Sequence, residues 1–132
     1  LHFPMPMHAQ ARPAARYFEA IALQSPKKAY AFHDKIFAAQ EKLTTDREAF
    51  LEATAKAVGA DVARLKKDLE SSKVTERIAG DEKLAQELGF TGPPGFVVAG
   101  VALRGAYPQE TFERIIEHRL KNPRRDVSTS KR

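Results

Sequence analysis

The chain has 132 residues, of which 42% are hydrophobic and 30% charged, so its length and composition suit one globular domain rather than a fibrous or fully disordered chain. Its longest apolar runs are a few residues, far below the roughly 18 that a membrane-spanning helix needs, which excludes such a helix. The chain contains no Cys, so disulfides, thiolate catalysis and Cys metal sites are excluded for the chain as given.

The formal net charge of +5 is concentrated at the C-terminus. Residues 121–132, KNPRRDVSTSKR, hold five basic residues and one acidic residue. The rest of the chain is therefore nearly neutral, which argues against a nucleic-acid-binding protein. We expect residues 121–132 to form a basic disordered tail.

The N-terminus predicts a short strand and then a helix. Apolar residues alternate with other types in LHFPMPM, which indicates a strand over residues 1–3 and a Pro-rich linker through residue 8. From residue 9 the apolar period becomes helical, and Pro13 suits the first turn of that helix. The residues expected on its inner face are Ala14, Ala15, Phe18, Ile21 and Ala22.

A second helix is predicted from Ser25 to about Gln40. Ser is a favoured N-cap, and Pro26 suits the first helical position because its missing N–H would be unbonded there anyway. The residues predicted to supply its apolar side are Tyr30, Ile36 and Phe37, with Phe32 alongside.

Three further helices are predicted before residue 90. Thr45 and Glu48 have the spacing of a capping box and predict the start of a third helix, which ends at Gly59. Asp61 is expected to cap a fourth helix. A fifth helix follows Ser72 and ends at Gly89, with Val74, Ile78, Ala85 and Leu88 on its apolar stripe.

Residues 90–106, FTGPPGFVVAGVALRGA, are the stretch that reads clearly as sheet. Apolar runs at residues 96–98 and 101–103, separated by a reversal at Gly100, predict a β-hairpin. We predict a cis peptide bond before Pro94, with a trans Pro-Pro turn as the alternative. A last helix begins at Pro108, and its inner face is expected to carry Phe112, Ile115, Ile116 and Leu120.

Three stretches together resemble DsbA-like thiol-disulfide oxidoreductases. The segment YAFHDKIFAAQEKLT, residues 30–44, is similar to the helix that opens the inserted helical domain of that family. The segment ELGFTGPPGFVVAGVALRGAYPQETFERIIE, residues 87–117, is similar to the family's cis-proline loop, terminal hairpin and final helix. LHFPMPMHAQA resembles the strand and Pro-rich exit that precede the helical block.

The resemblance implies an α/β fold that is mostly helical. It would hold an incomplete thioredoxin-like sheet, made of the β-hairpin plus the short N-terminal strand, with an inserted helical domain. The implied division is residues 1–8 for the thioredoxin-like strand and linker and residues 9–89 for the helical insertion. Residues 90–120 then hold the cis-proline loop, the hairpin and the final helix, and residues 121–132 form the tail.

The resemblance also implies a substrate-binding loop made of Pro93, Pro94 and Gly95. Pro94 would be the cis-proline that lies against the redox site and helps hold a substrate strand. Pro93 has no N–H, so one of the two backbone hydrogen bonds expected to such a strand is unavailable. The family's Cys-x-x-Cys unit has no counterpart here, so we assign no catalytic residue, no metal and no cofactor to the chain.

These features predict part of a DsbA-family disulfide oxidoreductase or isomerase that is redox-inactive by itself. The missing initial Met and the start in a strand favour a fragment. The alternatives are a redox-dead peptide-binding module and a glutathione-dependent isomerase relative of the same superfamily. The expected partner is an extended polypeptide substrate of the parent protein. The resemblance also implies that the central strand of the sheet is missing, and the candidates to fill its place are the N-terminal segment sliding inward and a second copy in a strand-swapped homodimer. No nucleic-acid or membrane partner is expected, and the family implies a periplasmic or secreted location.

The histidines predict no independent chemistry. His2, His8, His33 and His118 show no i, i+4 pairing, and none has a convincing ligand set beside it. His33 is followed by Asp34, but neighbouring helix residues point in different directions, so a structural or solvated pair is favoured over a catalytic one.

Overall fold

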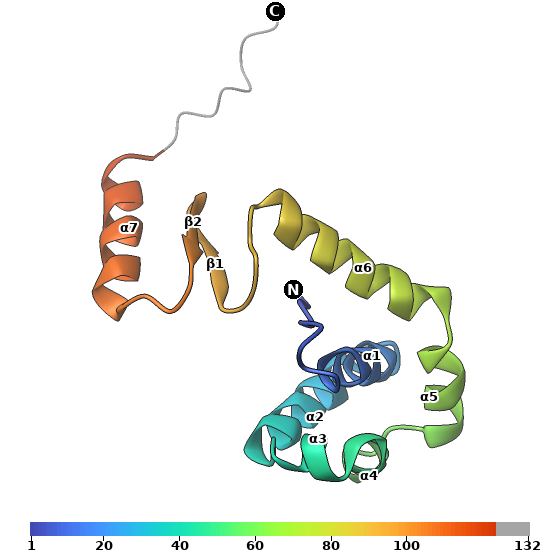
Figure 1. The fold of residues 1–132 in the computed structure, drawn as a ribbon. Coiled ribbons are helices and arrows are strands. Elements are labelled where there is room, and N and C mark those ends of the chain that lie inside the picture. The colour runs from blue at the N-terminus through green and yellow to red at the C-terminus, as the bar shows by residue number, and fades with distance from the viewer. Residues whose placement is uncertain (124–132) are drawn as a thin grey trace, which may run out of the picture. The chain divides into compact units, whose positions relative to one another are not determined.

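The computed structural model describes residues 1–123, which form seven helices and one two-stranded sheet (Figure 1). These residues divide between two compact units, Leu1–Glu87 and a second unit that begins at Leu88. The predicted mostly helical chain with a single hairpin is confirmed. No described helix is long and apolar enough to cross a membrane. The tail predicted for residues 121–132 lies outside the described residues from residue 124 onward.

Six helices make up the first unit, and α1 is at its centre. Helix α1 packs against α2, α4, α5 and α6. The core is built mainly from the apolar faces of these five helices, with small residues such as Ala20 and Ala29 allowing close approach. The bounds are α1 (Ala11–Ala22), α2 (Pro26–Ala38), α3 (Lys42–Thr45), α4 (Arg47–Ala57), α5 (Val62–Leu69) and α6 (Ser72–Glu87).

Local capping residues explain where several of these helices begin. The Ser25 hydroxyl accepts from the Lys28 N–H at 3.4 Å, and the Asp61 carboxylate accepts from the Arg64 N–H at 2.9 Å, as the sequence predicts. The predicted capping box is wrong, because Thr45 is the last residue of α3 and α4 starts after Asp46 without a side-chain cap.

The buried face of α2 agrees with the predicted one for Ile36 and Phe32 but not for Tyr30 and Phe37. Phe32 is 1% exposed and packs in the core, whereas Tyr30 is 64% and Phe37 63% exposed. Ala29, Phe32 and Ile36 share one helical stripe, and the stripe of Tyr30 and Phe37 lies beside it on the outer surface. The core of the first unit therefore includes the stripe of Phe32 and leaves the adjacent stripe of Tyr30 and Phe37 exposed.

The predicted N-terminal strand is absent from the described residues, because residues 1–5 have no strand partner. The backbone N–H of His2 donates to Asp81 Oδ2 of α6 at 2.8 Å, and its ring Nε2 lies 2.8 Å from Glu19 Oε1 of α1. The Asp81 carboxylate thus takes a backbone N–H that a sheet would use. Pro4 and Pro6 cannot donate to a ladder.

The second unit contains β1 (Gly95–Val98), β2 (Val101–Arg104) and α7 (Gln109–Lys121). The strands are antiparallel with Val98 opposite Val101, so the turn consists of Ala99 and Gly100, both with positive φ. This is the backbone twist that two-residue hairpin loops favour. Phe96 of β1 meets Phe112 of α7 edge to face, with ring centroids 5.0 Å apart, which fixes the helix on one face of the hairpin.

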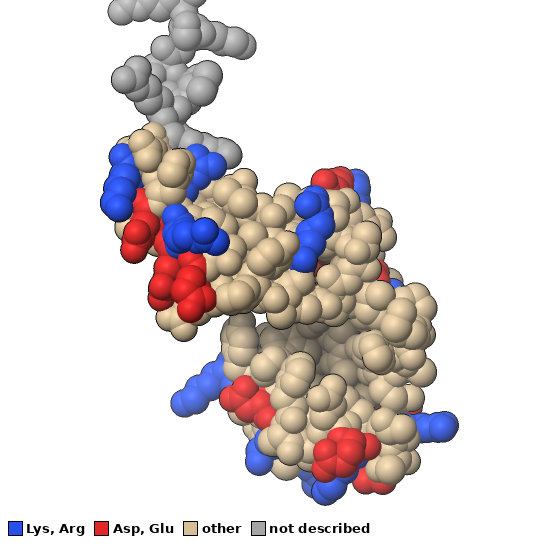
Figure 2. All heavy atoms as spheres, turned by 60° about the vertical axis from the view of Figure 1, so that its left-hand side comes forward, with Lys and Arg blue, Asp and Glu red and all other residues tan. Residues whose placement is uncertain are grey.

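Helix α7 buries less than its apolar pattern predicts. None of its residues is buried, and Ile116 and Leu120 are exposed. Two strands can cover only one side of a helix, so the prediction that both residues face inward is wrong for the described residues. Charged side chains of both signs cover another part of α7, as Figure 2 shows below the grey trace. The assignment of residues 1–8 and 90–120 to a thioredoxin-like domain and of 9–89 to an insertion stays a prediction.

Candidate functional site

The three residues predicted to bind substrate lie together on the surface of the second unit. Pro93, Pro94 and Gly95 lead into β1, and all three are exposed. The peptide bond between Pro93 and Pro94 is cis. The carbonyl oxygen of Pro94 accepts a hydrogen bond from the Gly105 N–H at 2.9 Å, which extends the hairpin ladder by one bond. Their role in substrate binding stays a prediction.

The strand β1 has an unpaired edge among the described residues, since the sheet contains only β1 and β2. Hydrogen-bonded and non-hydrogen-bonded pairs alternate along an antiparallel ladder. The bond between Pro94 and Gly105 makes that pair a bonded one, so the pairs at Phe96 and Val98 are bonded as well. The N–H and C=O groups of Gly95 and Val97 therefore point away from β2, toward the open edge.

A single arginine holds the loop in front of this strand. The guanidinium of Arg104 donates from Nε to the carbonyl of Gly89 at 2.7 Å and from Nη2 to the carbonyl of Leu88 at 3.3 Å. It also lies over the Phe90 ring, 6.0 Å from the centroid. A positive charge on these carbonyls, which directly follow the C-terminus of α6, is electrostatically favourable. Arg104 therefore ties the start of the loop to the end of β2.

The loop is also packed from inside. Phe90 is buried, and its ring lies so close to Gly95 that a Cβ at that position would sit 2.6 Å from Phe90 Cδ1. Only a residue without a side chain fits under the ring as it lies. The contact holds Gly95 against the Phe90 ring and so positions the beginning of β1.

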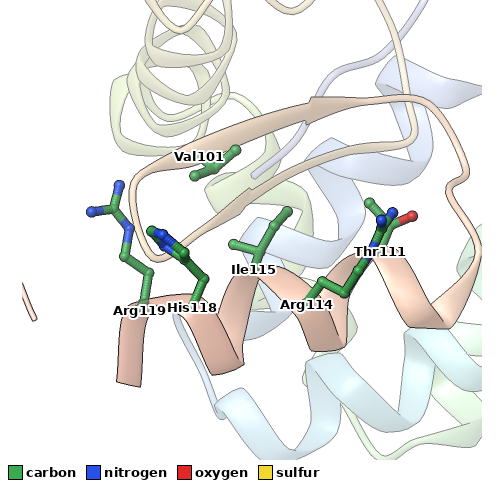
Figure 3. A pocket seen from close by; sticks show the side chains of 6 residues that line it. All are labelled: Val101, Thr111, Arg114, Ile115, His118 and Arg119. Atoms are coloured by element: carbon green, nitrogen blue, oxygen red, sulfur yellow. The ribbon is translucent and has the colours of Figure 1, made fainter. Parts of the chain in front are cut away.

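A separate shallow groove of about 370 Å³ lies between α7 and the hairpin (Figure 3). Val101, Thr111 and Ile115 give it apolar surface, and Arg114, His118 and Arg119 line the rest. None of the predicted loop residues lines it. It presents the positive charge of Arg114 and Arg119 beside an apolar floor.

One cluster in the first unit has the composition of a metal site. The ligand atoms of His2, Glu19 and Asp81 all lie within 4.8 Å of one another. The sequence prediction weighed each histidine against nearby residues only, and therefore missed a set whose members are brought together from the N-terminal segment, α1 and α6. The same fold leaves His33 beside Asp34 at 3.1 Å on an exposed surface, with no third residue that would make a catalytic set among the described residues.

The environment of Tyr17 shifts the pKa of its phenol. Burial, together with the negative charge of Glu48 and its hydrogen bond to the phenol, raises the pKa of Tyr17 to about 12. The phenol donates to Glu48 Oε1 at 3.3 Å. A phenol with this pKa stays protonated at neutral pH, so Tyr17 is a core residue rather than a general base.

Comparison with known proteins places these observations in a family. The profile described as "DSBA-like thioredoxin domain" matches residues 1–117. The chain is also 34% identical over 113 residues to a protein named Na(+)/H(+) antiporter NhaA from Herminiimonas arsenicoxydans. That match covers 86% of this chain and 17% of the antiporter's length. No solved structure matches the chain. With a family match over nearly its whole length, the chain belongs to the DSBA-like thioredoxin domain family.

Proposed function

We propose that this chain is the polypeptide-binding part of a DsbA-family thiol-disulfide oxidoreductase or isomerase, and that the cysteines of the reaction lie in another segment of a longer polypeptide. The observation that carries this proposal is the open edge of β1 beside the exposed Pro93–Pro94–Gly95 loop. The chain itself contains no Cys, so it cannot carry out thiol-disulfide exchange alone.

The open edge of β1 can pair with a further strand. Gly95 and Val97 direct N–H and C=O groups away from β2, and unpaired strand edges readily pair with another chain. Phe96, Val97 and Ile116 add exposed apolar surface in the same unit. A strand on this edge would satisfy the backbone groups, and a helix following it could cover the apolar side chains. In this family, the unit that carries Cys-x-x-Cys consists of a strand followed by a helix, and it would supply both.

The loop supports polypeptide binding at the end of the same strand. The Arg104 bonds and the Phe90 contact hold the loop in one conformation, so a substrate meets a site that needs little ordering. Pro93 offers a backbone carbonyl but no N–H, so an extended substrate would gain one backbone bond there instead of two. We expect weak binding of extended peptides for this reason.

The antiporter match supports the placement in a longer protein. It covers 17% of that protein, so a segment similar to this chain can be a minor part of a larger one. The transport activity in its name is a property of that protein. We propose only that the present chain also belongs to a longer polypeptide.

Reading the coding sequence on both sides of the chain tests the proposal directly. We expect a Cys-x-x-Cys or Cys-x-x-Ser motif upstream, after a predicted strand. The longer polypeptide should then reduce or isomerise disulfides in a model substrate, whereas the present chain should not. A longer reading frame without such a motif would contradict the redox role and leave the second candidate, a redox-dead peptide-binding module, which the exposed loop favours.

Peptide binding is tested on the chain itself. Fluorescence anisotropy with labelled extended peptides should detect weak binding that Pro94→Ala reduces at least several-fold. Pro6→Ala is the matched control, because Pro6 is also exposed but lies in the other unit. Equal binding by both variants would exclude the loop as the binding site. Glutathione titration of the longer protein separates the isomerase alternative, which predicts binding of glutathione rather than of peptides.

A second copy of the chain is the other source of an edge strand. Val97→Pro removes the N–H that points to the open edge and leaves the bonded pairs with β2 intact. If copies pair through β1, sedimentation should show a dimer for the wild type and a monomer for Val97→Pro. A wild-type chain that stays monomeric at all concentrations would exclude the swapped dimer.

A further inference from the structure

Three side chains from distant parts of the sequence converge in the first unit. His2 comes from the N-terminal segment, Glu19 from α1 and Asp81 from α6. The imidazole Nε2 of His2 is 2.8 Å from Glu19 Oε1, and all three ligand atoms lie within 4.8 Å of one another. Asp81 is 4% exposed, and the other two side chains are partly buried. This burial distinguishes the cluster from ordinary acidic patches, which are solvated.

We propose that His2, Glu19 and Asp81 bind a divalent transition metal ion, with Zn²⁺ as the preferred ion. An imidazole nitrogen and two carboxylate oxygens form a donor set that suits Zn²⁺. Three protein ligands leave a fourth tetrahedral position for water. Ca²⁺ is disfavoured because it takes six to eight oxygen ligands, and Mg²⁺ because it prefers an all-oxygen octahedral shell.

The geometry requires only small side-chain movements. With bond lengths near 2.1 Å, two ligands of a tetrahedral zinc ion lie roughly 3.4 Å apart. The present separations run from 2.8 Å for His2 and Glu19 to at most 4.8 Å within the set. Rotation of a carboxylate covers the difference. Asp81 Oδ2 accepts the backbone N–H of His2, which leaves Oδ1 for the ion.

The charges of the site also favour a cation. Two carboxylates face one nearby guanidinium, that of Arg77, whose nitrogens lie 3.8 Å from Glu19 Oε1 and from Asp81 Oδ1. These distances exceed normal hydrogen-bond lengths. The Arg77 side chain is 61% exposed, so it can move into solvent when an ion binds. Arg77 is thus a competitor of the metal, and removing it should strengthen metal binding.

Without an ion, the same groups form a polar network that joins the N-terminal segment to two helices. A purely structural network and a metal site make opposite predictions for Arg77. If the cluster is only a structural network, loss of Arg77 weakens that network and the variant binds no metal ion. In a metal site, its loss removes a competing positive charge and raises the affinity.

Isothermal titration of the untagged full chain with Zn²⁺, and the visible absorption of Co²⁺ as a second probe, test the proposal. We expect one ion per chain, and at least about a tenfold loss of affinity in His2→Ala and in Asp81→Asn, because each removes one of three ligands. His8→Ala is the matched control, since His8 is an exposed histidine of the same N-terminal segment. Arg77→Gln should bind more tightly than the wild type.

Circular dichroism of each variant keeps folding separate from binding. If the wild type binds Zn²⁺ no more tightly than His2→Ala does, the cluster is not a metal site. The same conclusion follows if His8→Ala loses as much affinity for Zn²⁺ as His2→Ala. A folded Arg77→Gln variant with unchanged or weaker binding also overturns the proposal. The result is independent of the polypeptide-binding role proposed for the other unit.

Discussion

The contact between Phe90 and Gly95 gives a quantitative test of how the loop is built. In Gly95→Ala the new Cβ would lie 2.6 Å from Phe90 Cδ1 and 2.8 Å from Cε1. Carbon atoms normally pack about 3.5–4.0 Å apart, so the ring or the strand must shift by about 1 Å. Phe90 is buried and has Arg104 over its ring, which limits where the ring can go. Overpacking of this kind costs about 1–3 kcal/mol.

Hydrogen exchange of the β1 and β2 amides is the suitable assay, because it reports on the hairpin separately from the helical unit. We expect faster exchange in Gly95→Ala by the factor that corresponds to this cost, roughly fivefold to 150-fold. Adding Phe90→Ala should recover part of the loss, because it removes the clashing ring.

Gly80→Ala is the matched control for this substitution. Gly80 lies within α6, and an added Cβ would meet nothing within 4 Å. Alanine favours a helix over glycine, so the control should stabilise the first unit by about 0.5–1 kcal/mol. Unchanged hairpin protection in Gly95→Ala, or no recovery in the double variant, would refute the packing argument.

Three more predictions concern other contacts. The folded pKa of Tyr17 is about 12 and the unshifted value is 10.0, so stability should fall as pH rises from 10 to 12, by up to about 3 kcal/mol. Tyr17→Phe should reduce this slope in urea unfolding. Arg104→Gln should accelerate exchange of the hairpin amides, because it loses the two bonds to the loop. Phe32→Ala should cost about 3–5 kcal/mol in thermal or urea unfolding, whereas Phe37→Ala should change stability by less than about 0.5 kcal/mol, since only Phe32 is buried.

The sequence predicts most helix boundaries because local chemistry sets them. The caps at Ser25 and Asp61 and the hairpin turn depend on residues within a few positions of one another. The capping box predicted at Thr45 does not form, because Thr45 belongs to a short extra helix, α3. Local signals of similar strength compete there, and sequence alone does not rank them.

Tertiary contacts account for the other differences. The choice of Phe32 over Tyr30 for the core of α2 depends on which stripe the neighbouring helices meet, and both stripes have the same period. The candidate site shows the same limit. The loop is visible as a Pro-Gly run, but Arg104, which holds it, is 15 residues from Gly89 and looks like an ordinary strand residue.

The long-range cluster of His2, Glu19 and Asp81 was beyond prediction for a related reason. His2 and Asp81 are separated by 79 positions, and no spacing rule connects them. The contact exists because α1 and α6 pack against each other and the N-terminal segment bonds to a side chain of each. Only the packing of the helices reveals that these residues meet.

The open edge of β1 has a consequence for how the chain behaves at high concentration. An apolar strand with a free edge is a template on which further strands can stack, which is the first step of fibril formation. Pro93 and Pro94 act as gatekeepers at one end of the strand, because neither can donate a backbone bond. The three residues Phe96, Val97 and Val98 have no such protection, so precipitation should begin there, and a lysine in place of Val97 should keep the chain in solution.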